Sequence, residues 1–290
     1  QAGDSLRRAS ASVMAQLIPR SALAPAEAGP LRVLSGLSPL WVTGGWVRDK
    51  LLDNPETNSA TGREWRRLRD LTGCPLADLD ILVDGVSARK FHFKCKRSAE
   101  LRAVLSGPPV LIPARGSRPI DTVKLRLGEQ EVDVTSLADS DARFGPIHAV
   151  GGGSSSWGEG HGLTSTVRDA SALDRLRADA SHRDATFNAL YYDPASGEVL
   201  DPSGRGLEDL RTGIVRMPHD AGVAASINED PVRLLRCLRM AARFGFELDD
   251  ELAAFDRDVF SHGGSGRAGA GPSGRVLFEL KKALLLHNRP

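Results

Sequence analysis

The sequence contains few cysteines, no long apolar run and almost no net charge. Three Cys in 290 residues show neither the paired nor the Cys-x-x-Cys spacing of a disulfide framework or a zinc site, and their number favours a reducing compartment. No apolar run approaches the roughly 20 residues that a membrane-spanning helix needs, which excludes an integral membrane protein. Lys and Arg (38) balance Asp and Glu (37), and the net charge of +1 excludes a globally basic, histone-like nucleic-acid binder.

The rest of the composition is that of a soluble globular protein. The length fits two domains of ordinary size, and 41% apolar with 26% charged residues is normal for such a chain. We interpret residues 1–30 as an N-terminal extension, because Leu6–Ala28 is rich in Ala, Ser and Arg and poor in acids. This stretch is either a frayed terminus or an organellar transit peptide. We therefore expect an intracellular protein, cytoplasmic or nuclear, or else mitochondrial or plastid.

Two glycine-rich segments interrupt the chain. Gly151–Gly162 and His262–Gly274 have the composition of flexible linkers and cannot form a packed core. The second contains Gly-x-Gly-x-x-Gly at Gly264–Gly269, which we interpret as linker because no strand precedes it. A basic run over Gly62–Asp70 either contacts an RNA backbone or forms a solvated helical face. The seven His residues are scattered, without His-Glu-x-x-His or comparable spacing.

The first half of the chain alternates strand and helix patterns. Pro39–Thr43 is a short apolar segment stopped by two glycines, and apolar residues at helical spacing follow over Trp46–Leu52. Asp78–Gly85 alternates acidic and apolar side chains, as a strand with one polar face does. These elements predict a mixed α/β sheet. Two further strands are expected at Thr122–Leu127 and Glu131–Leu137, with Gly128 as the hairpin turn between them.

After Asp201 the pattern becomes helical. In Glu229–Phe246, Asp230 is the expected N-cap and Pro231 takes the first helical position. An apolar face recurs every three or four residues, and an arginine face recurs at the same spacing beside it. A last helix is expected over Arg275–His287. The expected core face consists of Val232, Leu235, Leu238 and Ala242, and the basic face of Arg233, Arg236, Arg239 and Arg243.

Three acidic residues are candidates for a metal site. Asp78 and Asp80 are spaced i, i+2 on a strand, so both carboxylates project from the same face. Paired hard oxygen ligands suit Mg²⁺. Asp133, at the centre of a later strand, can bring a third carboxylate beside them, and such a cluster needs the positive charge that metal ions supply. Acids of an edge strand that face solvent are the alternative.

Glycine and arginine residues are candidates for phosphate and base contacts. The Gly44-Gly45 turn either presents backbone N–H groups to phosphate or is an ordinary turn that needs a positive φ. Arg48, one helical turn on, can add a charge-assisted contact to a triphosphate. The other candidates are Arg183, Asp184 and Asn188, which a helix start can bring to one ligand, Asp230 with Arg233, which can pair with a base edge, and Arg236 and Arg239, which serve phosphates or the fold. The plain alternative for the first three is a charged helix N-terminus, and for Asp230 with Arg233 it is an Asp–Arg salt bridge.

Six segments occur in an order that resembles a known family. Over roughly Leu40–Leu252 the chain resembles the class II tRNA nucleotidyltransferases, which are the CCA-adding enzymes, and their relatives the bacterial-type poly(A) polymerases. Gly274–Leu285 resembles a degraded version of the family's next motif. The six segments are GGWVRDKLL (Gly44–Leu52), DLDILV (Asp78–Val83), VDVTSL (Val132–Leu137), RDATFNALYYD (Arg183–Asp193), DPSGRGLEDLRTGIVR (Asp201–Arg216) and EDPVRLLRCLRMAARFGFELDDEL (Glu229–Leu252).

The resemblance implies an α+β fold, with a nucleotidyltransferase palm-like mixed β-sheet head (31–195) followed by an all-helical neck (196–290), and without the family's C-terminal body and tail domains. It implies that Asp78, Asp80 and Asp133 hold two Mg²⁺ ions. One ion would activate the RNA 3′-hydroxyl for attack on the α-phosphate of CTP or ATP, and the other would stabilise the leaving pyrophosphate. The implied nucleotide contacts are Gly45 and Arg48 for the triphosphate, Arg183 and Asp184 for ribose and phosphate, Asp230 and Arg233 for the base edge, and Arg236 and Arg239 beside them.

The resemblance favours CCA addition to the tRNA 3′ end over other tails. The segment before Asp133 reads TVKLRLGEQEVDV, which is closer to eukaryotic-type CCA-adding enzymes than to the bacterial polymerases. A bacterial-type poly(A) polymerase or A-adding enzyme is the alternative, and a truncated nucleotide- or RNA-binding protein is the second. His182 and Ala138 stand where the family often has Arg. Because the body and tail domains are absent from the sequence, we expect weak tRNA binding; no membrane or protein partner is expected.

Overall fold

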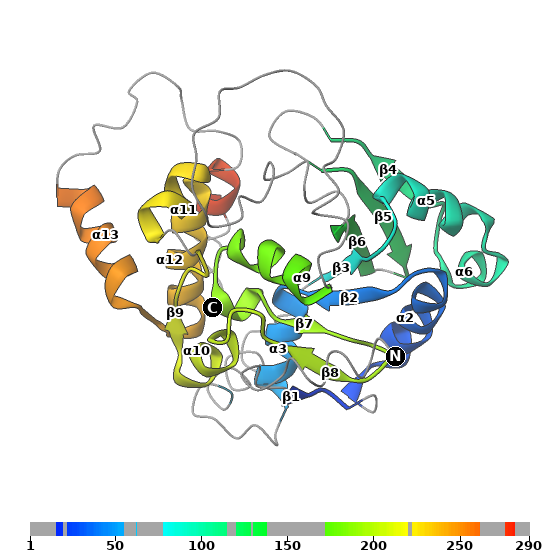
Figure 1. The fold of residues 1–290 in the computed structure, drawn as a ribbon, viewed down its shortest axis with the longest axis horizontal. Helices are drawn as coiled ribbons and strands as arrows, with labels where there is room; N and C mark the ends of the chain where they lie inside the picture. Colours follow the sequence, from blue (N-terminus) through cyan, green and yellow to red (C-terminus); the bar gives the residue numbers. More distant parts are fainter. Residues whose placement is uncertain are drawn as a thin grey trace.

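The computed structural model describes residues 16–19, 22–54, 62, 78–114, 120–128, 130–137, 172–219, 222–261 and 276–281. An eight-stranded mixed sheet forms its centre, in the order β1-β8-β7-β2-β3-β6-β5-β4 (Figure 1). Strands β3 and β6 pair in parallel, and β2 pairs antiparallel with β3. The strands are β1 (Gln16–Leu17), β2 (Leu40–Thr43), β3 (Leu79–Val83), β4 (Val110–Ile112), β5 (Thr122–Leu127), β6 (Gln130–Ser136), β7 (Tyr191–Tyr192) and β8 (Glu198–Leu200).

The strands and the first helix expected from the sequence are confirmed. β2 ends at the two glycines and leads into α3 (Gly45–Asp53), and β3 lies within the expected acidic strand. β5 and β6 form the expected antiparallel hairpin, where Gly128 has a φ of 63°. A positive φ of this size favours glycine, because a Cβ would clash with the backbone. Alternation and turn chemistry therefore located these elements correctly.

The two faces of the sheet carry different side chains. One face is apolar and lies under α2 (Pro25–Leu37), α3, α5 (Ala88–Arg97) and α6 (Ala99–Val104). On β3, Leu79 and Ile81 belong to this core, and on β6 so do Val132 and Val134. Since side chains alternate along a strand, Asp80 points to the opposite face. That face is covered in part by α9 (Ala172–Ser181), whose Leu176 and Ala180 pack with Trp41, Leu82 and Tyr191.

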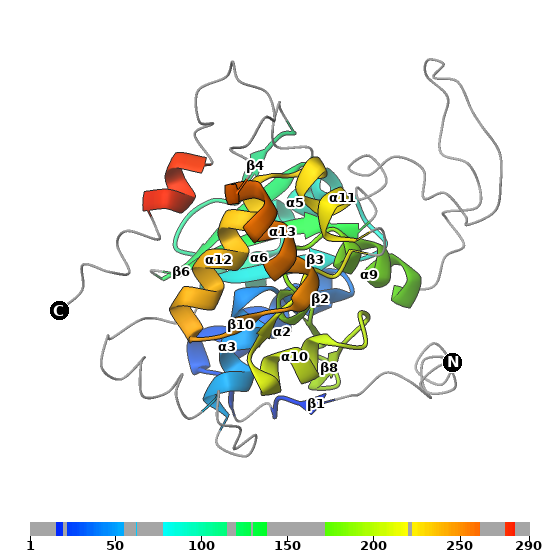
Figure 2. The same ribbon diagram turned by 90° about the vertical axis from the view of Figure 1, so that its left-hand side faces the viewer.

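The C-terminal part of the described chain is mostly helical and packs beside the sheet (Figure 2). It is not helical throughout, because β8 pairs with β7 in the main sheet and two short strands form a separate parallel pair. Arg183, Asp184 and Asn188 do not start an α-helix: they lie in a turn after α9 and in a short 3₁₀ helix. The elements are η4 (Thr186–Asn188), α10 (Gly206–Thr212), β9 (Ile214–Val215), α11 (Val223–Glu229), α12 (Val232–Phe244), β10 (Glu247–Leu248), α13 (Asp250–Ser261) and a helix over 276–281.

Helix α12 differs from the sequence prediction in its first residue and in its buried face. It begins at Val232, because Asp230 ends the preceding helix α11, although the Asp230 carboxylate still accepts a hydrogen bond from the Val232 N–H at 3.2 Å. The core face predicted from periodicity is partly wrong, because Ala242 is exposed and Leu235 and Leu238 are only half-buried. The helix packs against the turn after α9 as well as its own neighbours, which rotates the buried face. The buried apolar residues are Val232, Leu234, Cys237, Met240 and Phe244.

Several expectations concern the ends and inserts of the chain. Residues 25–30, which the sequence assigned to the extension, form the first part of α2, and residues 16–17 pair with β8. Both glycine-rich segments, most of the basic run over Gly62–Asp70, Cys74 and Ala138 lie outside the described residues. Cys95 and Cys237 are buried free thiols. In the part of the chain that the structure describes, no helix combines the length and apolar character needed to cross a membrane.

Candidate active site

Two of the predicted carboxylates lie side by side on adjacent strands. Asp80 of β3 and Asp133 of β6 are register partners across the parallel pair, and Asp78 immediately precedes β3. Asp80 and Asp133 therefore lie on the sheet face opposite the helix-covered core, and the charge of Asp78 acts on Asp80. Lys124 of β5 is the register partner of Asp133 on its other side, and its Nζ lies 2.7 Å from the Asp133 Oδ1. This hydrogen bond raises the pKa of Lys124, so the lysine stays charged beside the carboxylate.

The carboxylates interact unfavourably with one another. The pKa of Asp80 is raised to about 6: burial is the main cause, Arg183 opposes it, and the negative charges of Asp133 and Asp78 add to the rise. Protein atoms crowd the Asp80 carboxyl group, yet the residue as a whole is exposed to solvent. A crowded group of hard, mutually repelling oxygen donors is the chemistry that Mg²⁺ stabilises. The residues thus fit the predicted ion, and Asp78, Asp80 and Asp133 are the ones that would hold it.

The glycine turn touches the carboxylate directly. Gly44 has a φ of 74° and is the N-cap residue of α3. A Cβ at this position would lie 2.9 Å from the Asp80 Oδ2 and 3.7 Å from the Arg183 Nη1. The absence of a side chain therefore lets the turn approach the carboxylate. It also places the amino end of α3, where backbone N–H groups and the helix dipole favour anions, beside the acidic group.

Arg48 lies beneath the site. Its side chain is buried, with Nε 2.7 Å from the Asp49 Oδ1 and Nη1 2.9 Å from the Asn188 Oδ1. The guanidinium also stacks 4.5 Å from the ring centroid of Phe244 in α12. Arg48 thus joins α3, η4 and α12. Its contact with a triphosphate stays a prediction.

Arg183 and Asp184 belong to two adjoining networks. The Arg183 Nε donates to Asp179 at 2.8 Å, and the Tyr191 hydroxyl donates to the same carboxylate at 2.7 Å. Asp184 accepts hydrogen bonds from the Asn188 Nδ2 at 2.9 Å and from the Arg236 Nε at 2.5 Å. Burial raises the pKa of Asp184, but Arg236 and Asn188 outweigh it and bring the pKa to about 2. Asp184 therefore remains ionised and fixes α12 to the turn.

The predicted base-reading pair lies at the start of α12. Arg233 is buried, and its Nη1 donates to the Ser226 Oγ at 3.0 Å and to the Glu229 Oε2 at 2.5 Å. Asp230 is half-buried beside it. Further along the helix, the Arg239 Nε donates to Glu279 at 2.7 Å. The arginine face of α12 is therefore used largely in ion pairs, with the Arg236 side chain the most exposed of the three at 42%.

Sequence reasoning missed three residues that shape the site. Lys124 neutralises Asp133, and its signal was its register opposite that residue in the predicted hairpin. Asp179 and Tyr191 orient Arg183. Asp179 lies four residues before Arg183, which is the spacing of an ion pair on one helix turn. The Tyr191 contact had no local signal because it depends on where β7 lies beside α9.

Comparison with known proteins gives a consistent assignment. Residues 40–216 match the poly A polymerase head domain. The mitochondrial CCA tRNA nucleotidyltransferase of Saccharomyces cerevisiae is 30% identical over 222 residues, which cover 74% of this chain and 33% of that protein. The multifunctional CCA protein of Neisseria gonorrhoeae is 41% identical over 113 residues, which cover 39% of this chain and 25% of that protein. The chain thus spans a third or less of the length of these relatives.

Solved structures agree on the fold. A CCA-adding enzyme solved with ATP has a TM-score of 0.59 at 22% identity, over 94% of this chain and 50% of that one. The Thermotoga maritima CCA-adding enzyme, solved with tRNA, has a TM-score of 0.59 at 23% identity, over 93% and 51% of the two chains. Together with the head-domain match, which covers more than half of the sequence, these findings show that the chain belongs to the poly(A) polymerase head domain family.

Proposed function

We propose that this chain carries the nucleotidyltransferase centre of an enzyme that adds CCA to tRNA 3′ ends from CTP and ATP. The observation that carries the proposal is the pairing of Asp80 with Asp133 across β3 and β6, with the Gly44 turn packed against Asp80. Relatives named as CCA tRNA nucleotidyltransferases, and similar structures solved with ATP, CTP and tRNA, support this substrate class.

The residues divide the work of the reaction between them. Mg²⁺ bound by Asp78, Asp80 and Asp133 would supply Lewis-acid activation of the attacking 3′-hydroxyl and charge neutralisation on the pyrophosphate. The amino end of α3 at Gly44 and Gly45 receives phosphate oxygens through its backbone N–H groups. Arg183, held by Asp179 and Tyr191, presents a fixed cation beside Asp80. Arg48 and Asn188 tie this centre to Asp184 and α12.

The base is read on the proposed neck side of the site. Asp230 offers acceptors and Arg233 a fork of donors, which together match the hydrogen-bonding edge of a pyrimidine or purine. Arg236, half-exposed and oriented by Asp184, faces the same region and serves the phosphates. Because Asp184 is ionised and buried, it fixes the position of α12 relative to the head. The head at 31–195 and the neck at 196–290 stay the proposed division of the chain.

The proposal is tested by nucleotide incorporation onto a tRNA transcript that ends at the discriminator base. The chain is given Mg²⁺ with CTP alone, with ATP alone, and with both, beside Asp80→Asn and Asp133→Asn. Asp121→Asn is the matched control, because Asp121 precedes β5 and pairs with Arg89 of α5, outside the group of three aspartates. We expect C, C and then A to be added, with loss of at least about 100-fold in both site variants and none in the control.

Other outcomes separate the alternatives. Addition of A alone would contradict CCA addition and favour a poly(A) or A-adding enzyme. Because the chain spans a third or less of its curated relatives, weak tRNA binding and slow turnover are expected. Nucleotide binding measured directly by calorimetry therefore accompanies the assay. Binding of CTP that survives Asp80→Asn and Asp133→Asn unchanged would contradict the assigned site.

A further inference from the structure

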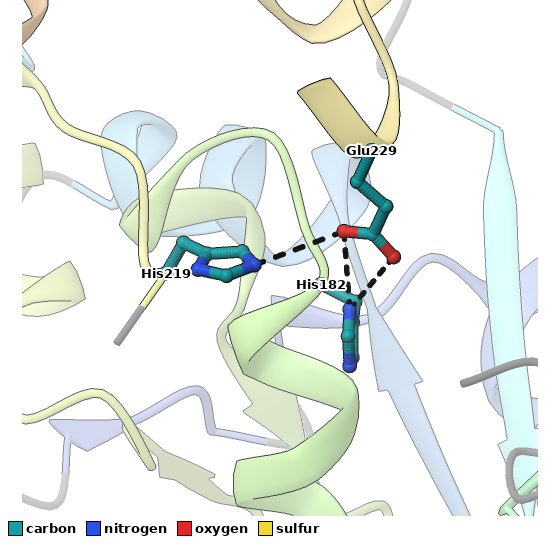
Figure 3. A group of neighbouring side chains, drawn as sticks. All are labelled: His182, His219 and Glu229. Atoms are coloured by element: carbon teal, nitrogen blue, oxygen red, sulfur yellow. Dashed lines mark hydrogen bonds and ion pairs between the residues drawn. The ribbon is translucent and has the colours of Figure 1, made fainter. Parts of the chain in front are cut away.

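A second group of possible metal ligands lies apart from the three aspartates. His182 follows α9, His219 precedes α11, and Glu229 is the last residue of α11 (Figure 3). The His182 Nδ1 lies 3.1 Å from the Glu229 Oε1, and the His219 Nε2 lies 3.8 Å from the Glu229 Oε2. One ligand atom from each of the three side chains lies within 4.8 Å of the others. Three separate segments of the chain thus direct nitrogen and oxygen donors to one point.

The spacing suits a small ion with imidazole ligands. Zinc–nitrogen bonds are about 2.0–2.1 Å, so the donors around a tetrahedral zinc lie roughly 3.3 Å apart. The observed 3.1 Å and 3.8 Å separations lie on either side of that value, and all three ligand atoms lie within 4.8 Å of one another. Side-chain movements of up to about 1.5 Å would complete the set. Two imidazoles favour zinc, cobalt or nickel over Mg²⁺, which prefers oxygen ligands. Three protein ligands leave a fourth position open to water.

The direction of the His182 pKa shift and the exposure of both histidines agree with this chemistry. Burial lowers the pKa of His182, and Arg233 and His219 lower it further, against the opposing effect of Glu229. A neutral imidazole is the form that binds a metal. The His182 and His219 side chains are 22% and 16% exposed, and Glu229 is 36% exposed. An ion can therefore reach the group from solvent without unfolding the surrounding elements.

Arg233 is the charged neighbour that opposes an ion and also orders its ligand. Its Nη1 donates to the Glu229 Oε2 at 2.5 Å while it is held by the Ser226 carbonyl and hydroxyl. A second cation nearby weakens metal binding. Ligating carboxylates are, however, usually held by such an outer hydrogen bond, which fixes their orientation. The Glu229 Oε1, which lies 3.1 Å from the His182 Nδ1, is the oxygen placed to bind the ion. The 3.8 Å contact of His219 is to the Oε2 that Arg233 also binds, so the His219 ring would turn toward Oε1 when the ion binds.

We propose that His182, His219 and Glu229 form a binding site for a zinc-class divalent ion, with Arg233 as the outer partner of Glu229. The site itself is independent of the nucleotidyltransferase proposal. A consequence that does rest on the proposed function is coupling, because Glu229 is shared with the base-reading arginine. An ion on Glu229 would loosen its pair with Arg233 and change the affinity for CTP, and CTP would change the affinity for the ion by the same factor.

The site is tested with Co²⁺ and Zn²⁺ by calorimetry and by the visible absorption of bound Co²⁺. Excess Mg²⁺ is present throughout, so that the three aspartates are occupied. The variants are His219→Ala and His182→Ala, and the matched control is His92→Ala, whose ring contacts the Pro109 carbonyl in another part of the fold. We expect one bound ion per chain, weakened at least about 100-fold in both site variants and unchanged in the control, with circular dichroism verifying that every variant is folded.

Two results would overturn the site. One is the absence of Co²⁺ and Zn²⁺ binding to the folded wild-type chain, and the other is equal binding by the wild type and both histidine variants. The coupling is measured separately as CTP affinity with and without saturating Zn²⁺. We expect a change of several-fold in the wild type and none in His219→Ala. If Zn²⁺ binds to the wild type but does not change its CTP affinity, the coupling is contradicted and the metal site is not.

Discussion

At the residue scale, Gly44 shows why a particular amino acid is needed. Its φ of 74° and the 2.9 Å approach of a Cβ to the Asp80 Oδ2 are two separate penalties. Gly85 carries the first penalty without the second, since its φ is 71° and nothing lies within 4 Å of a Cβ there. The pair of glycines therefore separates backbone strain from crowding of the site.

We expect Gly44→Ala to abolish most nucleotide binding as well as destabilise the fold. Gly44→Ala and Gly85→Ala should each lower the free energy of unfolding by about 1–2 kcal/mol, because both glycines have a positive φ. Only Gly44→Ala should also weaken CTP affinity, by at least about tenfold, because its methyl group displaces the Asp80 carboxylate. Chemical denaturation and calorimetry measure the two effects. Equal CTP affinities in Gly44→Ala and Gly85→Ala would contradict this account.

Asp184 gives the fold a defined response to acid. Its folded-state pKa of about 2 lies below the value of ~3.9 in an unfolded chain. The ionised group therefore stabilises the fold above about pH 4, and this contribution, on the order of 2 kcal/mol, is lost as the pH falls through about 2. We expect the stability gap between wild type and Asp184→Asn to be largest at pH 7 and to narrow toward pH 3 in urea denaturation. A gap that does not change with pH would refute this role.

At the element scale, α12 is the helix whose buried face sequence periodicity predicted least well. Apolar and basic residues both recur every three or four positions, so the pattern fitted more than one choice of buried face. The structure buries Met240 and exposes Ala242 because Cys237 and Met240 contact the Asp184 carbonyl and the Asn188 amide, respectively. The face is decided by the turn that it packs against.

Substitutions on α12 distinguish the two assignments. We expect Met240→Ala to cost about 2–4 kcal/mol of unfolding free energy, because it leaves a cavity beside Asn188. Ala242→Lys should change stability by no more than about 0.5 kcal/mol, since the position faces solvent. Thermal or urea denaturation of both variants is sufficient. A larger loss from Ala242→Lys than from Met240→Ala would restore the face expected from periodicity.

At the scale of the whole molecule, the proposed site has two sides. The carboxylates and the Gly44 turn belong to the sheet, whereas Arg233 and Arg236 belong to α12. Arg48 joins the sides through Asn188 and Phe244. A nucleotide that contacts both sides would reduce local opening on each of them.

We expect CTP with Mg²⁺ to slow amide hydrogen exchange in both β6 and α12. At 100 times its Kd, a ligand bound only by the folded state adds about 2.7 kcal/mol of stability. Asp80→Asn should remove the protection from both elements together. Exchange mass spectrometry resolves the two peptides, and protection confined to one of them would show that the nucleotide does not bridge the sheet and α12.

The sequence by itself determined the elements whose information is local. Three elements follow from alternation and turn chemistry over a few residues: the strand that contains Asp80 and starts directly after Asp78, the glycine turn after β2, and the hairpin at Gly128. The order of six motifs also determined the family, which the head-domain match over residues 40–216 bears out. Since Asp80 and Asp133 both alternate with buried apolar residues, their common face was already implied.

Only the tertiary structure decided the contacts between distant segments. Lys124 beside Asp133, Tyr191 on Asp179, Arg48 against Phe244 and the group of His182, His219 and Glu229 are of this kind. Local pattern could not find them, because it specifies which face of an element is buried but not which segment covers it. That choice depends on how the helices pack over the whole sheet, and their packing determines which charges and ligands meet.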